Sequence, residues 1–209
     1  IIEGGIDSQD FNLNISKDQF HIFCKKHNLK VNNRILLYAG RIVPQKGLID
    51  LIKAMAILNE KENFKLLIAG KPLNTLYYKE LINLIAKLKL NDKVIFIGHI
   101  DQLEMRVLIS LSEAVISPSL YEPFGMINLQ AAVMGKVVIT TNIVGSNDLL
   151  NKYKKILIVS PNSAACLAAA INKIDLVKTN RDKFNFSEYS WFNIANKILD
   201  IFKKYSKSE

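Results

Sequence analysis

The chain has 209 residues, 49% of them hydrophobic and 22% charged, which is ordinary for a globular protein and ample for a buried core. No apolar run reaches the roughly 18–20 residues that span a membrane. The net charge of +9 raises the question of a nucleic-acid partner, but the lysines are spread along the whole chain. We therefore expect no nucleic-acid partner, and keep a basic nucleic-acid binder as a remote alternative.

Two cysteines, Cys24 and Cys166, lie far apart among apolar residues in helix-like stretches. We expect buried free thiols, with a disulfide as the alternative. Free thiols favour a reducing compartment, so we expect a cytoplasmic protein. The positive charge also allows peripheral contact with the anionic inner face of a membrane. Because the chain begins with Ile1 rather than Met, we expect it to be part of a longer protein.

Six short β-branched runs alternate with segments of helical apolar spacing, and their starts lie about 20 to 30 residues apart, the length of a βα unit. Runs that are apolar on both faces predict a parallel sheet covered by helices on each side. The expected fold class is α/β, with a doubly wound, Rossmann-like, mostly parallel six-stranded sheet. The predicted strands are Ile35–Ala39, Lys65–Ala69, Val94–Ile97, Ala114–Ser117, Val137–Thr140 and Ile156–Val159.

The two flanks stand outside this alternation. Near the start, Ser16 with Gln19 three residues later predicts a helix cap, with Ile15 stapled onto Phe20. Near the end, an apolar stripe from Trp191 to Phe202 predicts a helix. The polar segment 175–185 is the most linker-like. We expect a single domain, with a lead-in and capping helix over 1–33, a Rossmann-like core over 34–175 and a closing helix over 187–206.

In such sheets, ligands bind beyond the carboxyl ends of the strands, where the βα loops converge. The loop Gly40–Gly47 follows the first strand and ends at the start of a helix. Arg41 and Lys46 place two cations near a helix N-terminus, which itself favours anions. The pattern predicts a phosphate site, although it is neither a Walker A loop nor the dinucleotide G-x-G-x-x-G. The alternative is a solvated basic loop.

A second unusual loop follows the strand Ala114–Ser117 and runs into a helix that begins near Gly125. Glycine there leaves backbone N–H groups of the first turn open to an anion. At the loop tip, the carboxylate of Glu122 can accept hydrogen bonds from sugar hydroxyls. The alternative is that Glu122 merely complements the helix dipole.

Two further loops carry weaker signals. His99 follows the third strand, where a lone histidine is more often a partly exposed polar residue than a catalyst. The segment 144–148 reads as a tight turn into a helix. There is no cluster of residues with metal-ligand spacing and no D-x-D motif. We therefore expect no metal or other cofactor, and expect Arg41, Lys46 and helix ends to neutralise a diphosphate.

These motifs together are recognisable. G-R-x-x-x-x-K-G at Gly40–Gly47, P-S-x-x-E-P-F-G at Pro118–Gly125 and the turn at Gly145 resemble glycosyltransferase family four in order and spacing. The resemblance covers nearly the whole chain. It extends to Gly5-Ile6-Asp7 at the start of the chain and to Tyr189-Ser190-Trp191 with Ala195 near its end.

The resemblance implies that the chain is the C-terminal half of a GT-B fold and that the N-terminal domain, which supplies most of the acceptor site, is absent. It implies a retaining hexosyltransferase that needs no metal. The expected partners are a nucleotide sugar, a glycan or lipid acceptor and the protein's own N-terminal domain. Cell-envelope polysaccharide or lipopolysaccharide biosynthesis is the expected role. We expect the isolated domain to bind nucleotide weakly and to transfer no sugar.

The residues of this chain that match the family's motifs are expected to have the same roles as in the family. The resemblance implies that Arg41 and Lys46 hold the diphosphate and stabilise the leaving nucleotide, and that Glu122 binds the donor sugar's hydroxyls. These are the expected catalytic residues. The expected donor-binding residues are Gly40, His99, Phe124, Gly125, Met126 and Gln130.

Departures from the family pattern keep other functions open. Gln130 stands where the family has a glutamate that binds ribose, and it lacks the charge. Ser146 replaces a glycine, which we expect to add bulk beside the ligand, and Asp148 replaces a nearby glutamate. A degenerate, non-catalytic nucleotide-sugar-binding module is therefore the main alternative, and a nucleotide-sugar epimerase is a further one.

Overall fold

The computed structural model describes residues 6, 17–27, 29, 33–58, 63–179, 187 and 190–206. Its sheet has six strands in the order β3-β2-β1-β4-β5-β6, and every neighbouring pair is parallel. All six predicted strands are confirmed, with ends that shift by at most one residue. The strands are β1 (Arg34–Ala39), β2 (Phe64–Ala69), β3 (Val94–Gly98), β4 (Ala114–Ser117), β5 (Val137–Thr141) and β6 (Ile156–Val159).

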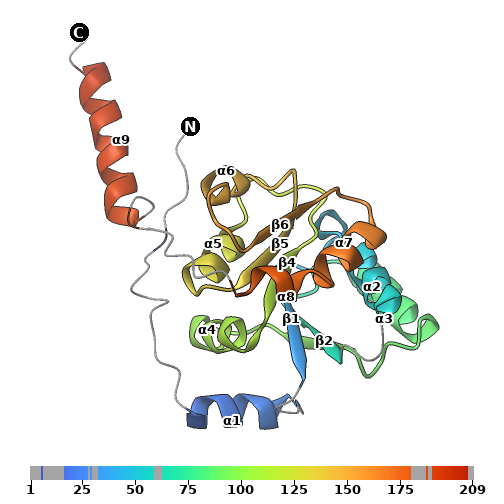
Figure 1. Ribbon diagram of the computed structural model, residues 1–209. Coiled ribbons are helices and arrows are strands. Elements are labelled where there is room, and N and C mark those ends of the chain that lie inside the picture. The colour runs from blue at the N-terminus through green and yellow to red at the C-terminus, as the bar shows by residue number, and fades with distance from the viewer. Residues whose placement is uncertain are drawn as a thin grey trace.

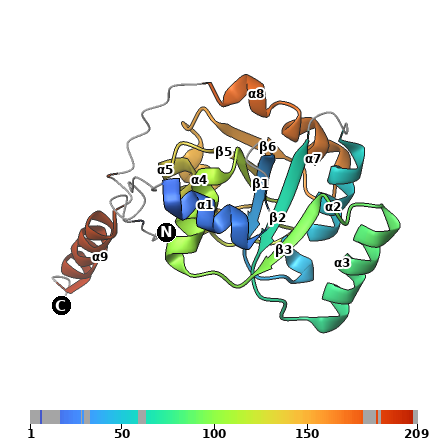
Figure 2. The ribbon, with the colours of Figure 1, turned by 90° about the horizontal axis from the view of Figure 1, so that it is seen from below.

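Helices cover both faces of this sheet (Figures 1 and 2). Alternate residues of each strand point to opposite faces, so Leu36 packs in a cluster with α2, α3 and α7, while Leu37 packs in a cluster with α4 and α5. The helical elements are α1 (Lys17–Lys26), η2 (Pro44–Lys46), α2 (Leu48–Ile57), α3 (Thr75–Lys87), α4 (Gln102–Leu111), α5 (Met126–Val133), α6 (Asn147–Leu150), α7 (Ala164–Ile171), α8 (Ile174–Val177) and α9 (Trp191–Ser206).

The strand order reverses direction at β1. From β1 the sheet grows one way through β2 and β3, and then the other way through β4, β5 and β6. The loops after β1 and β4 therefore leave the same edge of the sheet on adjacent strands. In open α/β sheets, this is the switch point at which ligands bind.

The helices at the switch point, α2 and α5, begin with a different kind of cap from α3, α4 and α7. Side chains cap α3, α4 and α7, where Asn74, Asp101 and Ser163 accept hydrogen bonds from backbone N–H groups. By contrast, α2 and α5 begin after Gly47 and Gly125, both in the left-handed region and without a side-chain cap. Glycine there supplies the turn and leaves the first N–H groups of each helix without a side-chain acceptor.

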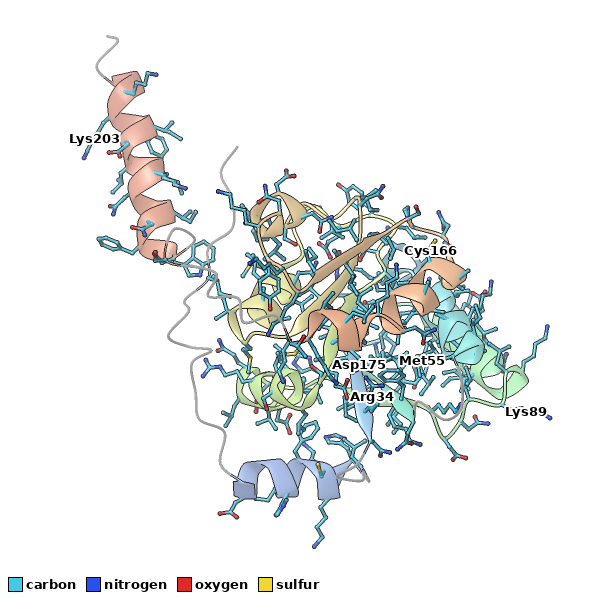
Figure 3. All side chains as sticks on the ribbon, viewed as in Figure 1. Arg34, Met55, Lys89, Cys166, Asp175 and Lys203 are labelled. Atoms are coloured by element: carbon cyan, nitrogen blue, oxygen red, sulfur yellow. The ribbon has the colours of Figure 1, made fainter. Side chains whose placement is uncertain are left out.

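Two expectations are wrong. Cys166 is exposed, because α7 buries Leu167, Ala168 and Ile171 and turns this thiol outward (Figure 3); Cys24 is buried as expected. The segment 175–185 is not linker-like at its start, because Ile174–Val177 forms α8 with Ile174 fully buried.

The helix predicted from the apolar stripe is confirmed as α9, which begins at Trp191 rather than at residue 187 and stands apart from the sheet in Figure 1. Its apolar side chains Trp191, Phe192, Leu199 and Phe202 are exposed. No helix among the described residues is long and apolar enough to cross a membrane. The expected cap at Ser16 with its staple lies outside the described residues, although α1 begins at the position it predicts.

Candidate functional site

The loops after β1 and β4 are joined to each other at the switch point. The carbonyl oxygen of Gln45 accepts hydrogen bonds from the backbone N–H groups of Leu120, at 2.8 Å, and Tyr121, at 3.3 Å. Beside them, the backbone of Gly47 packs directly on Pro118, and a Cβ at position 47 would lie 1.9 Å from the Pro118 carbonyl oxygen. The two motifs therefore form one continuous structure at the carboxyl edge of the sheet.

A pocket of about 340 Å³ opens between these loops. Its walls come from the end of β1, the end of β4 and the first turn of α5. Seven of the nine predicted site residues line it, which places the two motifs around one cavity. The lining residues are Tyr38, Ala39, Gly40, Arg41, Lys46, Ser117, Ser119, Glu122, Phe124, Gly125, Met126 and Ile127.

Charged groups of both signs meet in this pocket. The ammonium of Lys46 donates a hydrogen bond to the carboxylate of Glu122, and their side chains are only 11% and 20% exposed. Arg41 is exposed, and among the described residues its guanidinium has no hydrogen-bonding or ion-pair partner. One cation is thus held by the pocket's own carboxylate, and the other is free to meet a ligand.

A buried tyrosine fixes the backbone that carries Arg41. The hydroxyl of Tyr38 donates a 2.6 Å hydrogen bond to the carbonyl oxygen of Arg41. Burial of the phenol raises the pKa of Tyr38 far above its ordinary value, so the hydroxyl stays protonated and remains a donor. Sequence reasoning missed this residue, because a tyrosine in a strand looks like any other core aromatic.

The first turn of α5 forms the opposite wall. Gly125 has φ 87°, and a Cβ there would lie 2.7 Å from Cγ1 of Val144. The N–H of Ser146 also donates to the carbonyl of Phe124 at 2.7 Å, so the turn before α6 braces this wall. An unblocked helix N-terminus held in this way favours an anion.

Beneath the pocket lies a buried polar cluster that sequence reasoning did not single out. Asn128, which is fully buried, accepts a 2.6 Å hydrogen bond from the hydroxyl of Ser117 and donates to the hydroxyls of Thr140, at 3.1 Å, and Ser146, at 3.3 Å. These bonds tie α5 to β4, β5 and the start of α6. The expectation that Ser146 adds bulk beside a ligand is wrong, because its side chain is fully buried and points into this cluster.

The two remaining predicted residues lie outside the pocket lining. His99 is exposed, directly after β3 at the same edge of the sheet. Gln130 is partly exposed on α5, one turn beyond Met126, which lines the pocket. Within the described part of the chain, no group of three or more His, Cys, Asp or Glu residues could hold a metal ion.

The family model described as glycosyl transferases group 1 matches residues 20–190. An uncharacterized glycosyltransferase of Methanocaldococcus jannaschii is 27% identical over 97% of this chain and 53% of its own length. A lipopolysaccharide 1,2-N-acetylglucosaminetransferase of Salmonella typhimurium is 26% identical over 85% of this chain and 50% of its own. The chain thus spans about half the length of these relatives.

The fold has close counterparts among solved structures. Anabaena HepE, crystallised with UDP and glucose, superposes with a TM-score of 0.82 at 23% identity, over 96% of this chain and 55% of HepE. The all-parallel, Rossmann-like sheet with its pocket at the switch point is one half of a GT-B fold. The chain belongs to the group 1 glycosyl transferases, and the family resemblance seen in its motifs is confirmed.

Proposed function

We propose that this domain binds a nucleotide-diphosphate sugar as the C-terminal half of a retaining glycosyltransferase. With an N-terminal domain, it transfers a hexose or related sugar to a glycan or lipid acceptor. The observation that carries the proposal is the convergence of Arg41, Lys46 and Glu122 with the start of α5 in one pocket. Two cations and an open helix N-terminus suit a diphosphate, and a carboxylate among them suits sugar hydroxyls.

The cations also explain how such a site would speed transfer. As the bond from sugar to diphosphate breaks, negative charge grows on the leaving nucleotide. Arg41 and Lys46, fixed in advance, stabilise that charge more than they stabilise the ground state. In this proposal the two cations, with the N–H groups around Phe124, Gly125 and Met126, neutralise the diphosphate without a bound metal.

The nucleoside part of the donor would extend beyond the pocket. Gln130, one turn further along α5, would accept hydrogen bonds from the ribose through its amide oxygen. His99 would lie beside the base, at the same carboxyl edge of the sheet. Because an amide lacks the charge of a carboxylate, we expect weaker binding of the ribose here than with a glutamate.

Relatives support the substrate class. HepE was crystallised with UDP and glucose, and the Salmonella relative is named as a lipopolysaccharide sugar transferase. We propose a cell-envelope glycan or lipopolysaccharide precursor as the acceptor, with the enzyme working on the cytoplasmic side of the membrane. The net charge of +9 favours peripheral contact with anionic lipid there.

The exposed apolar face of α9 supports the proposal that a further domain packs against this helix. Trp191, Phe192 and Phe202 are 56%, 74% and 69% exposed. Soluble domains rarely expose so many large apolar side chains together unless another molecule or domain covers them. The relatives are about twice as long as this chain, which leaves room for a second domain of similar size. We propose that α9 packs on that N-terminal domain and that the isolated half transfers no sugar.

A non-catalytic binding module remains the second candidate, and the uncharged Gln130 is the observation that favours it. The two candidates differ in one measurement, because only the enzyme would transfer sugar from the donor when both domains are present.

The binding proposal is tested by a thermal-unfolding panel of nucleoside diphosphates and their sugar esters. A ligand that binds only the folded state raises the unfolding temperature by mass action, so the correct donor should stand out. If no nucleotide in the panel shifts the transition at millimolar concentration, the proposed function is overturned.

A further inference from the structure

The Lys46–Glu122 ion pair places an anion inside a pocket that suits anions. The carboxylate comes from the loop after β4 and the ammonium from the loop after β1, and both side chains are largely withdrawn from solvent. The pair therefore already uses one of the two cations that a diphosphate would need. A site that bound only a diphosphate would bind it more tightly without this carboxylate.

We infer that Glu122 makes the pocket prefer the sugar-bearing donor to the nucleoside diphosphate that transfer releases, and so helps to expel the product. This inference rests on the proposed function and adds a selectivity that the function itself does not require.

Free diphosphate pays an electrostatic penalty at this site. Its phosphates attract Lys46, and the carboxylate of Glu122 then faces an anion without its own cation. A carboxylate can only accept hydrogen bonds, and a doubly ionised terminal phosphate has no hydroxyl to donate in return. Its terminal phosphate also carries extra negative charge, because the second ionisation of a phosphate monoester has a pKa of about 6. Repulsion in a partly dehydrated pocket is stronger than in water.

The sugar-bearing donor reverses the contribution of Glu122. Esterification removes the extra charge of the terminal phosphate, which weakens the repulsion. The hydroxyls of the sugar can donate to the carboxylate and replace the N–H groups that it loses when Lys46 turns to the phosphates. Hydrogen bonds to an ionised acceptor are among the stronger ones in proteins. The same carboxylate thus opposes one ligand and supports the other.

A purely structural ion pair would behave differently. If Glu122 served only to hold the two loops together, its loss would loosen the pocket and weaken both ligands by the same factor. The two roles therefore separate in the ratio of two affinities rather than in either affinity alone.

The experiment is isothermal titration of the unmodified chain and of Glu122→Gln with matched pairs: UDP and UDP-glucose, GDP and GDP-mannose, and ADP and ADP-glucose. Glutamine keeps the size of the side chain and removes its charge. For the pair that binds the unmodified chain, we expect the diphosphate to bind about five- to twenty-fold more tightly to the variant and the nucleotide sugar to bind more weakly. Glu122→Ala should tighten the diphosphate in the same direction.

Two controls accompany these titrations. Glu80→Gln removes one exposed carboxylate from α3, outside the pocket lining, and should leave both affinities unchanged. Thermal unfolding without ligand confirms that each variant is folded. Equal changes in both affinities, or weaker diphosphate binding to Glu122→Gln, would overturn the inference while leaving the proposed function intact. If no pair binds the unmodified chain, the proposed function fails, and this inference with it.

Discussion

The carbonyl oxygen of Pro118 occupies the space that a side chain on residue 47 would need. A Cβ at Gly47 would lie 1.9 Å from that oxygen, and Gly47 also has φ 68°, a conformation that other residues rarely adopt. The contact joins the loop that carries Lys46 to the loop that carries Glu122. Glycine at this position is therefore required by the meeting of the two loops as well as by the turn itself.

Replacing this glycine should loosen the pocket and lower stability. We expect Gly47→Ala to reduce the free energy of unfolding by about 3 kcal/mol, since it combines left-handed strain with a clash against backbone. Gly135→Ala is the matched control, because Gly135 has φ 69° and nothing within 4 Å of its Cβ position. We expect it to cost only about 1 kcal/mol, from strain alone. Urea unfolding of both variants measures the difference, and equal losses would show that the Pro118 contact does not matter.

Both pocket cations, Lys46 and Arg41, should matter for turnover. In the full-length enzyme, we expect Lys46→Ala to raise the barrier by roughly 2–4 kcal/mol, as is typical when one group that stabilises developing charge is lost. Arg41→Ala should have an effect of the same order. Sugar-transfer kinetics measure both, and Lys53→Ala, an exposed residue of α2 outside the pocket, is the control. Near-unchanged turnover by Lys46→Ala would remove this residue from the mechanism.

The buried cluster around Asn128 should behave as one cooperative unit. Asn128→Leu leaves the hydroxyls of Ser117, Thr140 and Ser146 without the amide that now pairs with them, and each unpaired buried group costs about 1–3 kcal/mol. We expect a loss of at least about 2 kcal/mol. A double-mutant cycle of Asn128→Ala with Ser146→Ala measures the coupling through their 3.3 Å bond. Strictly additive losses would mean that this bond contributes nothing.

The sequence predicts the framework of the site better than its supporting contacts. The strands are predictable because buried parallel strands are apolar on both faces, and the pocket because two unusual loops follow neighbouring strands at a switch point. Asn128 gives no such signal, since a polar residue in a helix predicts an exposed position rather than a buried one. The Lys46–Glu122 pair was missed because each residue was assigned to a ligand rather than to the other.

The sequence also predicts poorly which side of a helix faces the core. Cys166 lies among alanines and leucine, so composition predicts burial, but only the packing of α7 decides which side faces the sheet. Similarly, α8 is only four residues long, and a helix so short gives no periodic pattern. Besides the burial of Ile174, charged contacts link α8 to residues distant in sequence, which a local stretch of sequence does not reveal.

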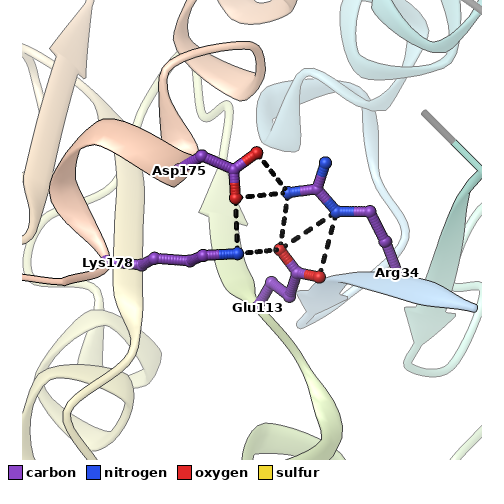
Figure 4. A network of polar contacts seen from close by, with 4 residues as sticks. All are labelled: Arg34, Glu113, Asp175 and Lys178. Atoms are coloured by element: carbon purple, nitrogen blue, oxygen red, sulfur yellow. Dashed lines mark hydrogen bonds and ion pairs between the residues drawn. The ribbon is translucent and has the colours of Figure 1, made fainter. Parts of the chain in front are cut away.

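Those contacts lie at the opposite edge of the sheet from the pocket and predict a pH dependence. Figure 4 shows Arg34 bonded to both Glu113 and Asp175, with Lys178 beside the two carboxylates. The hydrogen bond from Lys178, and next the charge of Arg34, hold the pKa of Asp175 below its ordinary value of 3.8. A depressed carboxyl pKa stabilises the fold at pH values above 3.8 and loses that contribution as the pH falls through the lower, folded value.

Asp175→Asn should therefore lose less stability on acidification than the unmodified chain. We expect the two unfolding free energies to differ at pH 6 and to converge as the pH falls below 3.8. Asp200→Asn is the control, because this carboxylate is 78% exposed on α9 and its contact with Lys203 is at 4.0 Å. Urea unfolding from pH 6 down to pH 2.5 makes the comparison. A constant difference across that range would show that Asp175 acts through packing and not through its charge.

The exposed face of α9 can be followed through Trp191, the single tryptophan of this chain. Its side chain is 56% exposed, so we expect red-shifted emission and efficient quenching by acrylamide. Adding a separately produced N-terminal half of the same protein, with its own tryptophans replaced by phenylalanine, should shift the emission to the blue and reduce quenching, because the indole then becomes buried at an interface. Leu199→Asp should abolish that change without altering the emission of the isolated chain, since Leu199 is itself 52% exposed. If Trp191 is already shielded in the isolated chain, the apolar face of α9 packs on its own domain, and its use as an interdomain surface is ruled out.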